Sequence, residues 1–412
     1  MQVFTVSRVH HLRRASFAPS IAAMASRTSG VLILLFSLVC LGTWPALLDL
    51  STLRGRHEAH SYLDYATTVL IVATIAALSA GELAELAQSS TISAALAGGG
   101  GLLLMLGNLS MQRSLIMGVP LSIVLPLQGS LTVVLGTTVN YFLQPEANDP
   151  HILFVGVAAF LLAIFLSATA HLTHERERRG TRLRRQRLAA RAASTATTQG
   201  SSSCCATWQP LLEEGATGRG HVEQSSVEAP SAASATAATA TAAAGLVVAF
   251  GGGVCFGGFS PLFNLAVNDE LGWIHNDPHG GKPLTVFNAN LCFCAAFALS
   301  AWLVNLSLMR WPPRGRSASS LHAYLTEGCR IRAFACAAGA TCAVGNACQF
   351  IGGAWAGFAT ADLVQAFPLV GTLWGVLLFG EFKSASRRVA GLLISMLTLY
   401  LAAVVLLCLS VR

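Results

Sequence analysis

Long, uninterrupted apolar segments recur along the chain and indicate its architecture. Each holds 18 or more mostly apolar residues, and as a helix each would cross the roughly 30 Å of hydrocarbon in a bilayer. A transmembrane β-barrel would instead show segments of about ten residues with alternating apolar and polar positions. The pattern therefore predicts an all-α integral membrane protein. We expect ten transmembrane helices, at residues 29–49, 62–83, 94–116, 121–142, 151–172, 243–265, 284–308, 332–354, 360–379 and 388–410.

The composition supports the same fold class and excludes others. Of the 412 residues, 53% are hydrophobic and only 11% are charged, whereas soluble chains carry about a quarter charged residues. The net charge of +7 does not indicate nucleic-acid binding, because the basic residues lie between apolar segments. The 11 cysteines form no CxxC pair and no Cys/His spacing suited to zinc, so we expect them to pack as small apolar side chains. We expect no metal, no cofactor and no nucleic-acid partner.

The apolar segments fall into two groups of five, separated by a long polar stretch. We therefore divide the chain into an N-terminal extension (1–28), a first five-helix repeat (29–172), a linker (173–242) and a second five-helix repeat (243–412). The linker is rich in Arg, Ser, Ala and Thr, a composition that cannot bury a core, so we expect it to be disordered. The extension holds Arg and Ser but no acid, which fits either a transit segment or a product that starts at Met24.

Most of the Arg and Lys lie on the side of the membrane that carries the linker. The positive-inside rule then places the linker in the cytoplasm and both termini on the other side. Five spans per group is an odd number, so the second repeat enters the membrane from the opposite side. This arrangement predicts two inverted repeats, a common plan of transporters. Three matches in the same order support it: Gly42–Pro45 with Gly258–Pro261, Gly107-Asn108 with Gly345-Asn346, and Pro126–Leu131 with Pro368–Leu373.

Amide side chains inside the spans are candidates for substrate contact. Asn108 and Asn346 each follow a Gly in the middle of a span, and Gln112 and Gln349 lie one turn later. A buried amide without a partner costs several kcal/mol, so each must face another helix, a cavity or a substrate. Both a hydrogen bond between helices and a contact with substrate remain open for these residues.

Two tryptophans and one acid are further candidates. Trp44 beside Pro45, and Trp374 in the second repeat, could stack on a flat ring or serve as interfacial anchors. Asp362 is the clearest ionisable residue within a span. It is either a helix N-terminal acid that the helix dipole favours or a carboxylate that takes up a proton with the substrate.

Several stretches carry a resemblance to a known family. The most specific is Ala361–Val370, followed by Trp374-Gly375 and Leu378–Glu381. The others are Leu41–Ala46, Tyr62–Tyr65, Leu106–Gln112, Gly136–Leu143, Phe259–Ala266 and Gly345-Asn346. Together they resemble the ureide permease family of the drug/metabolite transporter superfamily, over nearly all ten spans.

The resemblance implies a secondary active transporter that moves allantoin and related oxo-heterocycles such as uracil and xanthine, with proton symport. Flat rings edged with N–H and C=O groups need amides that donate and accept, and an aromatic face. Asp362 would couple protons. The substrate-binding residues would be Trp44, Asn108, Gln112, Gln128, Asn264, Asn346, Gln349, Gln365 and Trp374. The linker has no GxxxxGK[S/T] motif, only Gly215–Gly220, which argues against the nucleotide role suggested for plant members.

Other interpretations stay open at this stage. A different carrier of the superfamily, exporting nucleotide sugars, amino acids or organelle metabolites, has the same architecture. A nucleotide-sugar site would need cations within spans, and only Arg113 approaches that position. A membrane-embedded enzyme would need clustered carboxylates or histidines, which the sequence does not show. We expect a multi-pass membrane location with the plasma membrane favoured, although a transit-like N-terminus also allows an organelle membrane.

Overall fold

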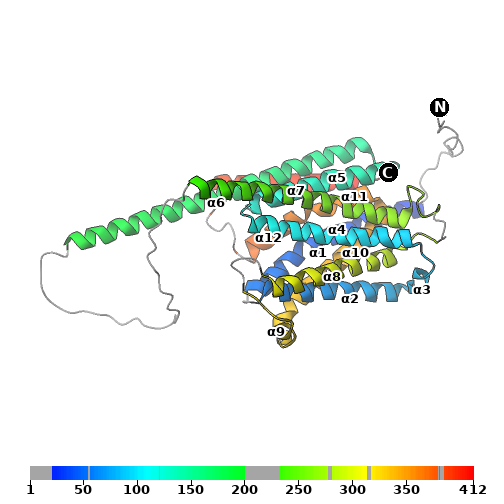
Figure 1. Cartoon of the computed structure of the whole chain (residues 1–412). Helices are drawn as coiled ribbons and strands as arrows, with labels where there is room; N and C mark the ends of the chain where they lie inside the picture. Colours follow the sequence, from blue (N-terminus) through cyan, green and yellow to red (C-terminus); the bar gives the residue numbers. More distant parts are fainter. Residues whose placement is uncertain are drawn as a thin grey trace, which may run out of the picture.

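The computed structural model describes residues 21–53, 56–119, 121–199, 232–276, 281–312, 317–378, 380 and 385–412. These residues fold mainly as helices, and ten of the helical segments are long and apolar enough to cross a membrane. This confirms the predicted all-α membrane fold and the predicted number of spans. The helices run side by side in one bundle (Figure 1).

Nine of the ten spans are continuous helices. They are α1 (Ile21–Leu53), α2 (Glu58–Ala80), α4 (Thr91–Ile116), α5 (Leu121–Leu143), α6 (Pro150–Gln199), α7 (Ala232–Asn268), α8 (Val286–Arg310), α10 (Cys329–Ala356) and α13 (Arg387–Leu409). Two short helices, α3 (Leu83–Leu86) and α9 (Leu321–Leu325), lie in connections. The ninth span is divided into α11 (Phe358–Ala361), the 3₁₀ turn η1 (Asp362–Ala366) and α12 (Phe367–Leu377).

Side-chain caps explain several helix ends. The Ser90 hydroxyl accepts from Ile92 N at the start of α4, and the Ser386 hydroxyl accepts from Val389 N at the start of α13. Gly81 ends α2 with a φ of 72°, a left-handed conformation that glycine adopts without steric cost. The span limits are therefore set by local sequence as well as by hydrophobicity.

The linker differs from its predicted state. Helix α6 continues past its apolar part to Gln199 and projects from the bundle, and α7 begins at Ala232 (Figure 1). Residues 173–199 and 232–242 are therefore helical in this structure, whereas their composition predicts disorder. Arg and Ala favour helix, and a helix already nucleated by a membrane span extends at little cost. Residues 200–231 of the linker and 1–20 of the N-terminal extension lie outside the described residues.

Each group of five spans packs mainly against the other group. Helix α1 lies along α10, α4 along α7, α6 along α13, and α2 along α8. Glycines bring some backbones into direct contact. A Cβ on Gly101 of α4 would lie 2.0 Å from the carbonyl oxygen of Phe293 in α8, and one on Gly339 of α10 would lie 2.4 Å from that of Tyr65 in α2. Small residues are common at such membrane helix interfaces because they allow close approach.

This close approach predicts a position-specific effect of one methyl group. Gly101→Ala should destabilise the bundle by about 1–3 kcal/mol, because the added Cβ forces α4 away from α8. The control is Gly98→Ala on the same helix, where the Cβ would meet Ala296 at an ordinary 3.6 Å. Thermal unfolding in detergent, followed by size-exclusion chromatography, should show a lower midpoint for Gly101→Ala alone. Equal midpoints for the two variants would refute the contact.

Candidate substrate and proton site

The break in the ninth span places an acid inside the bundle. Gly357, with a φ of 94°, precedes the short helix α11. The chain then forms the 3₁₀ turn η1, and α12 follows with Pro368 in its first turn. Such 3₁₀ stretches within a span often mark functional positions. Asp362 opens this turn and is 1% exposed. It forms no ion pair with any described residue.

The carboxyl group of Asp362 faces helix α5. Thr137 and Asn140 of α5 interact with it, and a Cβ on Gly136 would lie 3.2 Å from Asp362 Oδ2. Nevertheless, Asp362 Oδ2 and Thr137 Oγ1 are both buried without a hydrogen-bond partner of good geometry. An anion in this position is poorly compensated, so the site can hold a proton or a polar ligand.

A row of hydrogen-bonded side chains joins this acid to the surface. Asn268 Nδ2 donates to Asn264 Oδ1 (2.7 Å), Asn264 Nδ2 donates to Asn140 Oδ1 (3.2 Å), and Asn140 Nδ2 donates to Ser260 Oγ (3.0 Å). Asn140, Asn264 and Ser260 are buried, whereas Asn268 is exposed at the end of α7. The row links α5 to α7 at the face opposite the linker. The sequence-predicted residue Asn264 therefore already has protein partners.

The aromatic candidates lie in the bundle interior. The ring of Trp44 stacks on Tyr65 with centroids 5.1 Å apart, and Tyr62 lies 5.2 Å from Tyr65. The Tyr65 hydroxyl donates to Cys342 Sγ at 3.0 Å, and Asn346 Nδ2 approaches the same sulfur at 3.6 Å. The rings of Trp44, Tyr62 and Tyr65 form one aromatic wall in the first group of spans. Asn346 of the second group lies beside this wall, through the shared contact with Cys342.

The remaining amides differ in how far they are already bonded. Gln349 is 1% exposed and its Nε2 has no partner. Asn108 is partly exposed and lies one turn after Met105, whose sulfur accepts from the Tyr62 hydroxyl at 3.7 Å. In the described part of the chain, the side chains of Asn108, Gln112 and Gln365 form no hydrogen bond. Asn108 and Gln112 lie on α4, Gln349 lies on α10, and Gln365 lies in η1.

Two other candidates hold helices together. Gln128 Nε2 donates to Ser110 Oγ (3.0 Å) and to the carbonyl oxygen of Ala249 (3.2 Å), so it joins α4, α5 and α7. Its Oε1 is buried and unpartnered. Trp374 Nε1 donates to Thr43 Oγ1 at 3.0 Å and ties α12 to α1. Neither residue contacts the aromatic wall through these bonds.

An ionic cluster, defined by six side chains, closes the linker face and was not predicted as a unit. Asp64 accepts from Arg56 Nη2 (2.5 Å) and from the Tyr324 hydroxyl (2.6 Å). Glu327 pairs with Arg56 (2.8 Å) and with His60 (2.5 Å). The members of the ionic cluster are Arg56, His60, Asp64, Tyr324, Glu327 and Arg332.

The ionic cluster joins the two groups of spans. Arg56 lies just before α2, and His60 and Asp64 lie in its first two turns, whereas Tyr324 and Glu327 lie around α9. Burial opposes ionisation of Glu327, but hydrogen bonds from His60 and Arg56 outweigh it and lower the pKa of Glu327. Burial, with the hydrogen bond to Asp64, raises the pKa of Tyr324 to about 12. Glu327 is therefore ionised and Tyr324 is protonated at neutral pH.

Two of the stretches that resemble the family contain residues whose role the sequence did not reveal. Tyr62–Tyr65 includes both tyrosines of the aromatic wall and Asp64, and Gly136–Leu143 includes Thr137 and Asn140. Thr137 and Asn140 lie near a span end, where sequence alone indicates no role for a Thr or an Asn. Their importance depends on facing Asp362, which lies more than 200 positions later.

Nine continuous transmembrane helices and one broken span that holds a buried acid have the plan of a membrane carrier. The ureide permease family model matches residues 61–410. The chain is 37% identical to "Ureide permease 1" of Arabidopsis thaliana over 390 residues, which cover 93% of this chain and 97% of that protein. It is 35% identical to "Probable ureide permease A3" of Vigna unguiculata over 378 residues, covering 88% and 98%.

"Ureide permease 5" of Arabidopsis thaliana is 36% identical over 405 residues, covering 94% of this chain and 95% of that protein. The chain belongs to the ureide permease family. Permeases are transporters and not a class of enzymes. The protein is thus a multi-pass membrane protein of a transporter family, as the sequence predicted.

The ionic cluster predicts a pH-dependent effect of Glu327→Gln. The pKa of Glu327 is lower in the folded protein, so its contribution to stability is present above its ordinary pKa of 4.5 and is lost as pH falls through the folded value. At pH 7, Glu327→Gln should lower the unfolding free energy by roughly 1 kcal/mol, because the group is partly exposed.

Thermal unfolding in detergent at pH 7 and at pH 3.5 measures this effect. The midpoints of wild type and Glu327→Gln should differ at pH 7 and converge at pH 3.5. The control is Glu146→Gln, an exposed acid on the opposite face, which should match wild type at both pH values. A gap that stays constant between the two pH values would contradict the assignment.

Proposed function

We propose that the protein is a secondary active transporter that moves allantoin and related oxo-heterocycles, such as uracil and xanthine, together with protons. The observation that carries the proposal is family membership, since the relatives compared above are all named ureide permeases. The bundle interior supports it, because an aromatic wall and unbonded amides suit a flat, neutral ring edged with donors and acceptors.

We place the substrate between the two groups of spans, against Trp44. The free amides of Asn108 and Gln112 would supply hydrogen bonds from α4. Asn346, whose Nδ2 approaches Cys342 Sγ in this state, would supply one from α10. Gln349 and Gln365 would extend the set. Gln128, Asn264 and Trp374 remain in the proposed site, although each is bonded to protein in this state. Their contact with substrate would require those bonds to exchange.

The inverted-repeat plan gains support from equivalent contacts. Gly107 of α4 packs against Phe256 of α7, and Gly345 of α10 packs against Cys40 and Leu41 of α1. When Gly42 is aligned with Gly258, Cys40 aligns with Phe256. Gly107 and Gly345 therefore contact corresponding positions of the two repeats. A second pair of contacts corresponds in the same way: Gly101 of α4 contacts Phe293 of α8, and Gly339 of α10 contacts Tyr65 of α2. A duplicated scaffold of this kind suits alternating access.

Proton coupling is assigned to Asp362. It is buried, lacks a cation among the described residues, and has one carboxyl oxygen without a partner. The row from Asn268 to Asn140 gives it polar contact with the face opposite the linker. We propose that this face is outside the cytosol, and that the protein resides in the plasma membrane. Arg113 lies at the bundle surface in a groove between α4 and α8, so the nucleotide-sugar alternative gains no interior cation.

Uptake of labelled allantoin and uracil tests the function. In cells lacking their own carriers, expression should produce concentrative uptake that is several-fold greater at pH 5.5 than at pH 7.5, and a protonophore should remove it. Asp362→Asn should abolish accumulation against a gradient while retaining exchange of labelled for unlabelled substrate, because its side chain can fill the site but cannot release a proton.

The matched control for Asp362→Asn is Glu146→Gln, on the same face and exposed, which should transport normally. Surface abundance must be equal in all variants. No uptake of either compound would refute the substrate class, whereas undiminished accumulation by Asp362→Asn would remove only this residue from the coupling mechanism.

The aromatic wall predicts a graded effect of Trp44 substitutions on the KM for allantoin. Trp44→Leu should raise KM about 3- to 10-fold through loss of ring stacking, and Trp44→Phe should raise it less. The control Trp273→Leu changes a tryptophan that is 51% exposed outside the spans and should leave KM unchanged. Initial uptake rates over a range of concentrations measure KM. Equal KM values for Trp44→Leu and wild type would exclude ring stacking at this position.

A further inference from the structure

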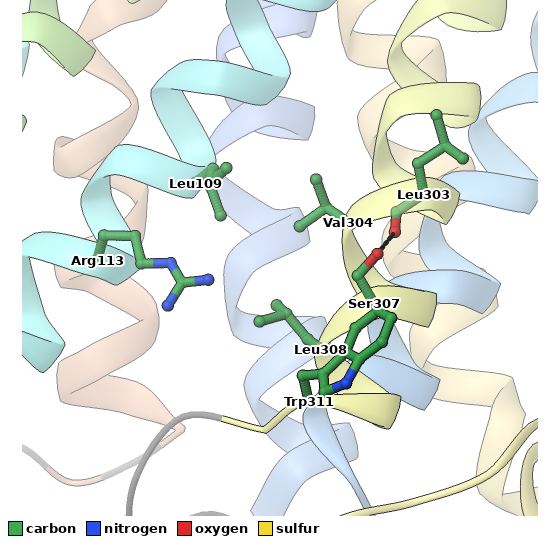
Figure 2. Close-up of a pocket in the computed structure, with 7 residues that line it drawn as sticks. All are labelled: Leu109, Arg113, Leu303, Val304, Ser307, Leu308 and Trp311. Carbon is green, nitrogen blue, oxygen red and sulfur yellow. Dashed lines mark hydrogen bonds between the residues drawn. The ribbon is translucent and has the colours of Figure 1, made fainter.

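An apolar groove with one cation lies between α4 and α8, near the linker face (Figure 2). Its volume is about 360 Å³. The same two helices are in backbone contact at Gly101, near the opposite face, so the groove occupies the end of the helix pair away from that contact. It is lined by Leu109, Arg113, Leu303, Val304, Ser307, Leu308 and Trp311.

The groove opens at the depth of the membrane–water boundary. Arg113 lies in the last turn of α4, and Trp311 directly follows α8. Trp311 is 71% exposed and Leu303 is 70% exposed. Large exposed apolar side chains on a membrane span face acyl chains, and a tryptophan at a span end lies among headgroups. The groove therefore opens toward the bilayer and not toward the aromatic wall.

The cation in the groove is not neutralised by any side chain that the structure describes. Arg113 forms no ion pair with any described residue, and its side chain extends from α4 toward α8 (Figure 2). The Ser307 hydroxyl donates to the carbonyl oxygen of Leu303 at 2.7 Å, so it does not compensate the charge. Arg310, whose guanidinium lies 5.9 Å from the Trp311 ring, adds a second positive charge at the same end of α8.

We propose that this groove binds an anionic phospholipid of the linker-side leaflet. The phosphate would accept hydrogen bonds from the Arg113 guanidinium, and an acyl chain would lie along Leu109, Leu303 and Leu308. A soluble anion would leave the leucine walls unused, and a neutral apolar molecule would leave the cation uncompensated. Basic pockets between transmembrane helices are typical sites for such lipids. This inference does not depend on the transported substrate.

Photo-crosslinking in nanodiscs tests the proposal. The full-length protein is labelled with phosphatidylglycerol or phosphatidylcholine, each carrying a diazirine in the acyl chain, and adducts are mapped by mass spectrometry. Phosphatidylglycerol should label peptides containing residues 109–113 and 303–311 more strongly than phosphatidylcholine does. Arg113→Gln should reduce that labelling about fivefold, the effect of one basic residue near anionic lipid, and Arg113→Lys should reduce it less.

Arg388→Gln is the matched control, because Arg388 is exposed at the same face at the start of α13. It should leave groove labelling unchanged. Equal labelling by the two lipids, or unchanged labelling of Arg113→Gln, would overturn the proposal. An unchanged size-exclusion profile for Arg113→Gln separates loss of binding from misfolding, and labelling of the groove that free allantoin displaces would assign it to substrate instead.

Discussion

The structure depends on one constraint: a polar group inside a bilayer must find its partner within the protein. At the face opposite the linker, the Asn264 amide donates to the Asn140 amide oxygen across α5 and α7. At the linker face, Asp64 and Glu327 neutralise Arg56 and Arg332. The buried groups that the fold leaves incomplete include the carboxyl oxygen of Asp362 and the amide nitrogen of Gln349.

These incomplete groups distinguish function from packing. A hydrogen bond between helices fixes one arrangement, whereas an unbonded polar group favours whatever arrangement supplies its partner. The polar layers lie at the two ends of the spans and connect different groups of helices. If one layer opens while the other stays closed, the interior is exposed to one side at a time. A carrier needs such alternation.

Long apolar segments revealed the fold, because a helix that crosses lipid must be apolar along its whole length. The glycines singled out in the sequence also mark close helix contacts, since Gly107 packs against Phe256 and Gly345 packs against Cys40 and Leu41. Sequence reasoning could not find the Asn140–Asn264 bond or the ionic cluster, because their members are separated by 100 to 300 positions. The helical ends of the linker could not be found from sequence for a different reason. Composition describes whether a segment can bury a core, but not whether an adjoining helix will extend through it.

The extension of α6 has an electrostatic consequence. Ser386 at the start of α13 donates to Glu177 at 2.7 Å, which marks the level where α6 leaves the bundle. At 1.5 Å per residue, Arg187 lies about 15 Å beyond that level if α6 continues straight. The Debye length in physiological salt is about 8 Å. Arg178 and Arg179 can therefore help to hold the span in its orientation, whereas Arg187 is screened from the headgroups and free to attract an acidic surface in solution.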